Sequence, residues 1–254
     1  MRKKVIAANW KMYKTSAEAK EFCLKLRPLL TAQESVQSII FAPFTALAAL
    51  KEGLADTDIA LGAQNFYPQN EGAYTGEISL NMLKEFGVTY VLIGHSERRG
   101  IFGESNGLIR EKLLKALAED FKPILCIGEP WEIREKGEAL EYCLKQLMSA
   151  FAGLNTAEIK KIVIAYEPIW AIGSGKSATL EDAEEMLKGI RRYLQDNFGA
   201  EAAEEMPLLY GGSVKVENIA QFMQKENIDG ALIGGASLKA ESFSQMIRFR
   251  EMQK

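Results

Sequence analysis

The chain has 254 residues, of which 47% are hydrophobic and 26% are charged, and its formal net charge is −3. This length can bury a large core without cross-links, and it fits either two average domains or a single α/β barrel. The basic residues are dispersed along the chain, so we expect neither nucleic acid nor an anionic membrane surface as a partner.

The cysteines and the histidine content argue against a metal site. The chain has three widely spaced cysteines and one histidine, from which no ordinary zinc site can be assembled. We therefore expect reduced thiols and no metal.

The basic start of the chain leads into an apolar stretch that ends at Asn9 and Lys11, too short for a signal peptide. No apolar run approaches the roughly 18 residues of a membrane span, and we expect a cytoplasmic protein.

Short apolar runs rich in β-branched residues recur along the whole chain. They cover residues 5–10, 38–43, 59–64, 88–94, 123–128, 162–167, 207–212 and 230–235. They are almost continuously apolar rather than alternating, which is typical of strands that are covered on both faces.

Charged segments with a helical period lie between these runs. The clearest open with serine or threonine, as helices commonly do, and span residues 15–30, 79–87 and 179–199. Alternating strands and helices imply parallel pairing through right-handed crossovers, and eight such units fit one closed (β/α)8 barrel, a TIM barrel, over residues 1–254. A doubly wound sheet is the alternative, but the first run ends in Asn-Trp-Lys instead of a glycine-rich fingerprint loop.

Polar residues follow several of the runs. A barrel of this kind carries its active site at the carboxyl ends of its strands. The residues at these ends are Asn9, Lys11, Gln64, Asn65, His95, Glu97, Glu167, Gly211, Gly212, Ser213, Gly234 and Gly235. Any one of them can simply mark where a strand meets solvent. Together, however, they indicate a ligand-binding or catalytic site, because one rim then carries an acid, a cation, an imidazole, amides and two glycine pairs.

The two glycine pairs follow the seventh and eighth runs, where barrels commonly bind phosphate. A residue without Cβ lets backbone N–H groups approach an anion closely. A tight turn is the alternative explanation of either pair, but the presence of both in these two units favours phosphate.

The segment Tyr166–Ala178 contains Gly-Ser-Gly-Lys-Ser, yet it lacks the first glycine of a P-loop. A dinucleotide-binding loop would follow its strand directly, which this one does not.

We interpret residues 168–178 as a lid over a ligand rather than a plain surface loop, because this segment contains apolar residues such as Ile169 and Trp170. Glu167 at its base would lose water on closure, which raises the pKa of a carboxyl group and makes it a stronger base. With Lys11 and His95, this suggests enolisation, in which donors hold a developing oxyanion.

Five motifs, in order, resemble those of triosephosphate isomerase: AANWKM, GHSERR, AYEPIWAIGSGK, YGGSV and DGALIGGASL. The similarity extends from about Val5 to beyond Leu238. It implies interconversion of dihydroxyacetone phosphate and D-glyceraldehyde 3-phosphate, a step of glycolysis and gluconeogenesis, by proton transfer through an enediolate and without a cofactor.

The resemblance also implies roles for individual residues. Glu167 would move a proton between C1 and C2, and His95 would polarise the carbonyl as a neutral electrophile. Lys11 would balance phosphate and oxyanion charge, Asn9 would contact the substrate, and Glu97 would support the polar network. The helix expected directly after His95 would disfavour its charged form. The phosphate would be held by backbone N–H groups of Gly173, Ser213, Gly234 and Gly235.

The family is usually dimeric, and QNFYPQNEGAYTGE looks like its interdigitating loop. Thr75 would then reach toward Asn9–Lys11 of a second copy. The positions that depart from the family pattern are Tyr13, Tyr74, Leu80 and Ser174. They affect the expected dimer affinity and lid rates rather than the reaction.

Two alternatives remain beside this interpretation. One is another sugar-phosphate barrel enzyme, such as an aldolase with a Schiff base at Lys11, which needs a desolvated lysine of lowered pKa. The other is a non-catalytic phosphate-binding barrel or scaffold dimer. Such a barrel could keep the glycines and lose the acid–base groups, yet Lys11, His95 and Glu167 are all present.

Overall fold

The computed structural model describes residues 2–31, 36–171 and 178–253. Within these residues eight parallel strands close into one barrel, ordered as in the sequence, with β8 paired to β1. The strands are β1 (Lys4–Asn9), β2 (Val36–Ala42), β3 (Ala60–Ala63), β4 (Val88–Ile93), β5 (Lys122–Ile127), β6 (Val163–Tyr166), β7 (Leu208–Tyr210) and β8 (Gly230–Ile233). The expected TIM barrel is confirmed.

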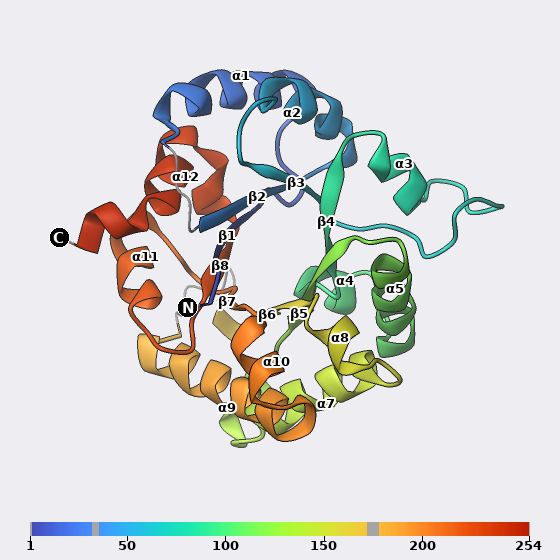
Figure 1. Cartoon of the computed structure of the whole chain (residues 1–254), viewed down its shortest axis with the longest axis vertical. Helices are drawn as coiled ribbons and strands as arrows, with labels where there is room; N and C mark the ends of the chain where they lie inside the picture. Colours follow the sequence, from blue (N-terminus) through green and yellow to red (C-terminus); the bar gives the residue numbers. More distant parts are fainter. Residues whose placement is uncertain (1, 32–35, 172–177, 254) are drawn as a thin grey trace.

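The helices form a ring around the strands (Figure 1). They are α1 (Ser16–Leu26), α2 (Leu47–Gly53), α3 (Leu80–Lys84), α4 (Ser96–Gly100), α5 (Asn106–Ala118), α6 (Trp131–Glu135), α7 (Ala139–Phe151), α8 (Thr156–Ile159), α9 (Leu180–Phe198), α10 (Ala200–Glu205), α11 (Val216–Met223) and α12 (Ala240–Ile247). In the described part of the chain, none of them is long and apolar enough to cross a membrane.

The three helices expected from their first residues begin where the sequence indicates. Thr15 and Thr179 each form a capping box with the acid three residues later, and the Ser79 side chain accepts the N–H of Met82. These bonds satisfy N–H groups that a helix start leaves without partners. The first segment is helical only as far as Leu26, because Pro28 lies in the tighter 3₁₀ turn that follows it.

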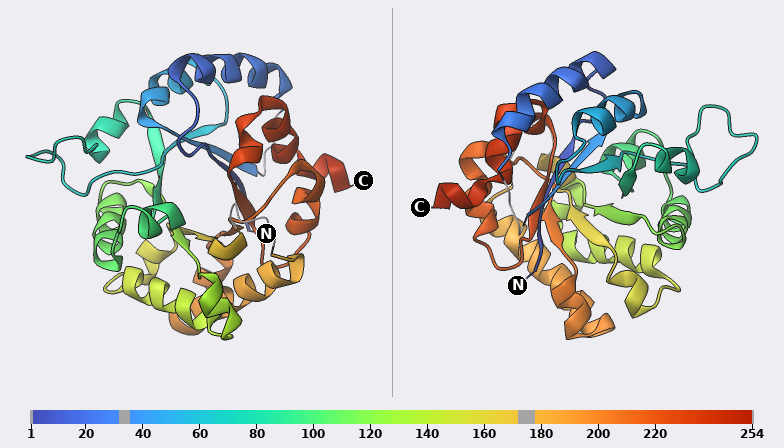
Figure 2. Two further views of the ribbon diagram at one scale, coloured as in Figure 1. Left: turned by 180° about the vertical axis from the view of Figure 1, so that it is seen from behind. Right: turned by 45° about the horizontal axis from the view of Figure 1, so that its top comes forward.

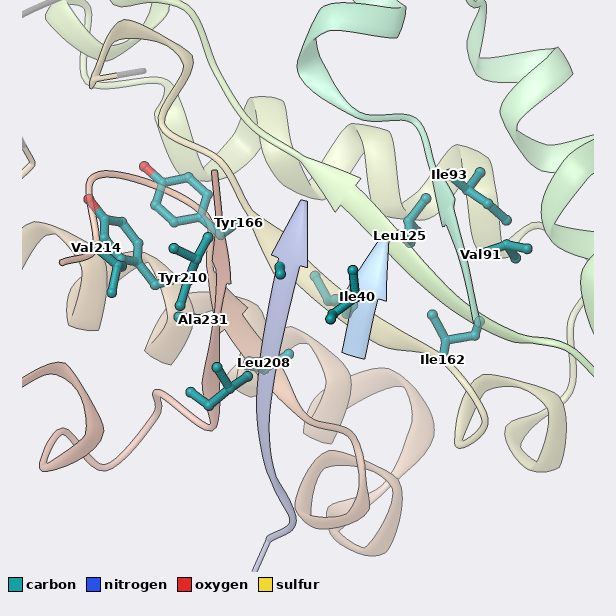
Figure 3. Packing of buried hydrophobic residues seen from close by; sticks show 14 of the residues in the cluster. Ile40, Val91, Ile93, Leu125, Ile162, Tyr166, Leu208, Tyr210, Val214 and Ala231 are labelled. Carbon is teal, nitrogen blue, oxygen red and sulfur yellow. The ribbon is translucent and has the colours of Figure 1, made fainter. Parts of the chain in front are cut away.

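The core has two layers, one inside the barrel and one between the strands and the helices. Along β6, Val163 and Ala165 belong to the inner layer, whereas Ile164 and Tyr166 belong to the outer one. Figure 3 shows outer-layer side chains from several strands, including Ile40, Leu125 and Tyr166. Both faces of each strand are therefore apolar, which explains the almost continuous apolar runs in the sequence.

Gly62 of β3 is required by the inner layer. A Cβ at this position would lie 2.3 Å from Cδ1 of Phe41, a buried residue of the neighbouring strand. Two carbon atoms cannot approach this closely, so the large ring on β2 needs a residue without a side chain beside it.

A cluster of buried charges lies at the end of the barrel at which the strands begin. The Asp229 carboxylate is fully buried and accepts hydrogen bonds from Arg2 Nε at 2.8 Å and from the N–H of Leu208 at 3.0 Å. It also pairs with Arg191, whose guanidinium is itself largely buried. Since neither charge is left without a partner, the cluster can be tolerated in the interior.

The segment between β3 and α3 is the exception to the compact outline. It projects away from the barrel in every view (Figures 1 and 2). It contains Tyr74 and Thr75, both exposed, and the ring of Tyr74 packs on Tyr67 with centroids 4.5 Å apart.

Candidate active site

The alternation of the strands directs polar side chains into the mouth of the barrel. Val5 and Ala7 of β1 lie in the inner layer, and two residues further along the strand ends at Asn9. Val163 and Ala165 of β6 lie there too, and two residues further is Glu167. Because side chains alternate with a period of two, Asn9 and Glu167 continue the inward rows where the apolar layer ends.

His95 and Glu167 are in direct contact. Nε2 of His95 lies 2.9 Å from Oε1 of Glu167, and the second oxygen of that carboxylate accepts the N–H of Ser96 at 2.9 Å. Both side chains are almost completely buried. His95 directly precedes α4, and its Nδ1 accepts the N–H of Glu97 at 3.3 Å. The neutral imidazole therefore carries its proton on Nε2.

Lys11 joins the same cluster through Glu97. Its Nζ lies 2.8 Å from Oε1 of Glu97, and Oε2 of Glu97 lies 3.6 Å from Nδ1 of His95. The Lys11 backbone has φ of 50°, a strained value for a residue with a side chain. Two hydrogen bonds hold it there: its N–H donates to Asn9 Oδ1 at 3.0 Å, and its carbonyl accepts from Gln64 Nε2 at 2.9 Å.

The pKa values of Glu167 and His95 are shifted in opposite directions, because each group is the other's partner. Burial raises the pKa of Glu167, but the charge and hydrogen bond of His95, the N–H of Ser96 and the charge of Lys11 outweigh it, and the pKa is lowered. Burial lowers the pKa of His95, but Glu167 and then Glu97 outweigh it, and the pKa is raised.

The glycines at the ends of β7 and β8 face the same cluster. A Cβ on Gly234 would lie 3.4 Å from Cε of Lys11, so the exit of β8 adjoins the lysine. A Cβ on Gly211 would lie 2.8 Å from Cγ of Glu167. Gly211 is therefore needed to make room for the carboxylate side chain.

For the remaining described positions expected to bind phosphate, the structure gives the exposure and the local backbone but no contact with Lys11 or Glu167. Ser213 is half-buried in the turn after β7, and Gly235 is exposed at the start of the 3₁₀ turn Gly235–Leu238. Gly173 lies outside the described residues, as does Ser174, so the expected lid is described only at its two ends.

A pocket of about 390 Å³ opens beside the cluster. Asn9, Lys11, His95 and Glu97 contribute to its wall, and so does Phe102, which is 65% exposed. Together with Gln64 and Asn65, six of the residues selected from the sequence therefore share one concave surface, as a ligand site requires.

A family model described as triosephosphate isomerase matches residues 4–250.

The chain belongs to the triosephosphate isomerase family.

Named relatives support the same assignment over full length. The triosephosphate isomerase of Dictyoglomus turgidum is 49% identical over 248 residues, which cover 98% of this chain and 100% of the relative. That of Finegoldia magna is 50% identical over 250 residues, covering 98% and 99%. That of Thermus thermophilus is 46% identical over 248 residues, again covering 98% and 99%. Membership in the triosephosphate isomerase family confirms the expected isomerase.

Gln64 and Glu129, both near strand ends, make contacts that were not expected from the sequence. Gln64 supports the Lys11 backbone, as described above. Glu129, two residues after β5, is fully buried and accepts hydrogen bonds from Tyr166 Oη at 3.0 Å and from Trp170 Nε1 at 2.8 Å. Gln64 was selected from the sequence as a strand-end residue, and Glu129 could have been selected from its place near the end of a strand, but the partners of both are distant in sequence.

The environment of the three cysteines keeps their thiols protonated. Cys23, Cys126 and Cys143 are free and buried. Burial raises the pKa of Cys23 to about 11 and raises the pKa of the other two further. A thiol that stays protonated is a poor nucleophile, so none of the three is suited to covalent catalysis at neutral pH.

Proposed function

We propose that the chain interconverts dihydroxyacetone phosphate and D-glyceraldehyde 3-phosphate, with Glu167 as the base and His95 as the electrophile. The observation that carries this proposal is the 2.9 Å contact between Oε1 of Glu167 and Nε2 of His95, both buried at strand ends. A base and a hydrogen-bond donor one hydrogen bond apart can act on adjacent carbon and oxygen atoms of one small substrate.

In the forward step the Glu167 carboxylate takes a proton from C1 of the ketose as the oxygen on C2 gains negative charge. The Nε2–H of His95 and the Lys11 ammonium stabilise that oxygen. The C1 hydroxyl proton moves to the oxygen on C2, with His95 as the carrier, and Glu167 returns a proton to C2. One C–H bond breaks, one forms, and no net proton is consumed.

The tautomer of His95 supports its role. Its Nδ1 accepts a backbone N–H, so in the neutral ring the proton sits on the nitrogen that faces Glu167. A donor on that nitrogen is what an enediolate oxygen needs.

Substrate binding would strengthen the base. When the substrate carbonyl oxygen accepts a hydrogen bond from Nε2–H of His95, that N–H no longer faces Glu167. Glu167 then loses the charge and the hydrogen bond of His95, which lower the pKa of Glu167 in this structure. Burial, the largest influence and one that raises the pKa, then dominates. The raised basicity expected from the sequence is thus proposed for the complex.

Lys11 is proposed to balance the charge of the phosphate and the enediolate, with Glu97 holding it and Asn9 contacting the substrate. Its Nζ is paired with Oε1 of Glu97 at 2.8 Å, so the nitrogen that an aldolase would use for a Schiff base is already held in an ion pair, which argues against an aldolase. Backbone N–H groups of Ser213, Gly234 and Gly235, together with Gly173 in the lid, are proposed to hold the phosphate.

Two measurements test this function. In D2O, the purified chain is expected to incorporate deuterium at C2 of the aldose formed from the ketose, because the base exchanges its proton with solvent. Product without deuterium would indicate a transfer that bypasses a solvent-exchangeable base.

Borohydride added together with substrate is expected to leave the chain active. Loss of activity, with the reduced substrate covalently attached to Lys11, would support the aldolase.

We also propose that two copies associate through the projecting segment between β3 and α3. It carries the exposed Tyr74 and Thr75, and the pocket that holds Lys11 and His95 is flanked by the exposed apolar side chains of Met12 and Phe102. An apolar rim beside a polar pocket is suited to cover by another chain. Sedimentation of Thr75→Arg against the unchanged chain tests this. A dimer that persists in the variant would argue against contact through Thr75.

We propose a cytoplasmic location for the chain. The reaction for which the family is named belongs to glycolysis. Fractionation of cells that express the tagged chain tests the location.

A further inference from the structure

The side chain of Arg99, on α4, folds back against the ends of β4 and β5. Its Nε donates to the Gly94 carbonyl at 2.7 Å, and its Nη2 donates to the Cys126 carbonyl at 3.0 Å. On the outer side, Nη1 donates to Oδ1 of Asn106 at 2.7 Å. All three nitrogens of one planar group are therefore used at once, a geometry that the single nitrogen of a lysine cannot reproduce.

The two carbonyls lie where the pairing between β4 and β5 ends. The last paired residues are Ile93 and Leu125, so Gly94 and Cys126 are the next residues in the register of these two strands. Gly94 has φ of 71°, and the chain leaves the strand direction there. A Cβ on Gly94 would also lie 2.8 Å from Nη2 of Arg99, so glycine leaves room for the guanidinium. Arg99 thus connects the two strands beyond the point at which their backbones pair.

This connection lies directly before the proposed electrophile. His95 follows Gly94, and the imidazole of His95 and the N–H of Ser96 each lie 2.9 Å from an oxygen of the Glu167 carboxylate. The backbone N–H of Arg99 also donates to the His95 carbonyl at 3.0 Å. The side chain of Arg99 thus holds Gly94 and its backbone holds His95, so the peptide between these two residues is fixed from both sides.

We propose that Arg99 is a positioning residue of the isomerase reaction, because it fixes the peptide before His95 and so keeps Nε2 of His95 directed at the reacting atoms. The inference rests on the proposed function, in which that Nε2–H stabilises the enediolate oxygen. A donor that is already in place needs no reorientation during the reaction. In the described part of the chain, the Arg99 side chain donates to Gly94, Cys126 and Asn106, none of which is proposed to hold the phosphate. Arg99 therefore acts on proton transfer rather than on binding.

The test compares Arg99→Lys, which keeps the charge but cannot span both carbonyls, with Arg27→Lys. Arg27 is the matched control, because its Nη1 also donates to two backbone carbonyls, those of Gly53 at 3.2 Å and Ala55 at 3.0 Å. It lines the same hollow as Val36, the first residue of β2, and so lies at the opposite end of the barrel.

The kcat of Arg99→Lys is expected to fall about tenfold to a hundredfold, the effect of a small displacement of a catalytic group. Its KM and its binding of inorganic phosphate should stay within about twofold, and Arg27→Lys should change none of these quantities by more than that. A kcat of Arg99→Lys within about twofold of the unchanged chain would overturn the proposal, and so would a higher KM at constant kcat.

A second measurement reports on the histidine directly and does not depend on catalysis. The chain contains a single histidine, so its isotope-labelled imidazole gives one set of NMR signals. The proton on Nε2 should exchange slowly with water in the unchanged chain, because it is buried and faces Glu167. Exchange should be clearly faster in Arg99→Lys and unchanged in Arg27→Lys. Equal exchange in Arg99→Lys and in the unchanged chain would overturn the positioning role even if kcat falls.

Asn106→Ala carries the test if Arg99→Lys does not fold. It removes only the outermost acceptor of the guanidinium, at an exposed position. The His95 proton should again exchange faster with water, and an unchanged exchange rate would overturn the proposal. Faster exchange in a variant of a chain that shows no isomerase activity would support the positioning of His95 and locate the error in the proposed function.

Discussion

Replacing Glu167 by glutamine keeps the shape of the side chain and removes its ability to accept a proton from carbon. If this carboxylate is the base, turnover should fall by about 10²–10⁴, the usual contribution of a positioned general base. At about 1.36 kcal/mol per factor of ten, the activation barrier rises by about 2.7–5.4 kcal/mol.

The structure limits the effect of this change on stability. The carboxylate accepts from both His95 Nε2 and the N–H of Ser96, whereas an amide has one oxygen and must turn its NH2 toward the other donor. An unsatisfied donor costs about 1–3 kcal/mol. Burying an amide in place of a charged carboxylate offsets part of that cost. The free energy of unfolding should therefore change by less than about 3 kcal/mol, and the variant should remain folded.

The assay follows interconversion of the two triose phosphates by the purified chain and by Glu167→Gln, with no metal or cofactor added. Phosphate binding is measured in parallel, because it should be nearly intact in the variant. Turnover within tenfold of the unchanged chain would refute the assignment of Glu167 as the base. An inactive unchanged chain that still binds phosphate would support the non-catalytic barrel.

Asp229→Asn provides the matched control, because it also neutralises a fully buried carboxylate but at the opposite end of the barrel. It breaks the pairs with Arg2 and Arg191 and should destabilise the fold by about 3–5 kcal/mol, the usual effect of removing one partner of a buried ion pair. The kcat of the folded fraction should stay within about twofold. A collapse of kcat in this variant would mean that loss of any buried carboxylate disables the enzyme.

Two further predictions concern the core and the thiols. Gly62→Ala should destabilise the chain by about 1–3 kcal/mol in urea unfolding, because its Cβ would overlap the Phe41 ring; an unchanged midpoint would contradict the packing. At pH 8 a thiol reagent should label none of Cys23, Cys126 and Cys143 in the folded chain and all three in urea, because burial raises each pKa. Since unfolded thiols ionise near the ordinary value of 9, stability should be complete below about pH 9 and should fall as the pH rises toward the folded values, about 11 for Cys23. Constant stability from pH 8 to pH 11 would contradict this.

Much of the fold could be predicted from the sequence, because its determinants are local. A strand buried on both faces needs an apolar run, and a helix start needs a capping side chain within three residues, as at Thr15, Ser79 and Thr179. Once the barrel is inferred, the positions of Lys11, His95 and Glu167 at one end follow, because the carboxyl ends of its parallel strands share one rim.

Only the tertiary structure decided how those residues interact. Ser96 and Glu167 are 71 positions apart, and nothing in either local sequence indicates that one carboxylate oxygen accepts the N–H of the other residue. A pKa depends on which charges lie within a few ångströms and on how much water is excluded, so the mutual shifts of His95 and Glu167 could not be inferred from strand ends. The same holds for the hydrogen bond from Arg99 to the carbonyl of Cys126, 27 positions further along the chain. The periodicity of a sequence records which face of an element is buried, but the partner on that face is fixed only when the barrel closes.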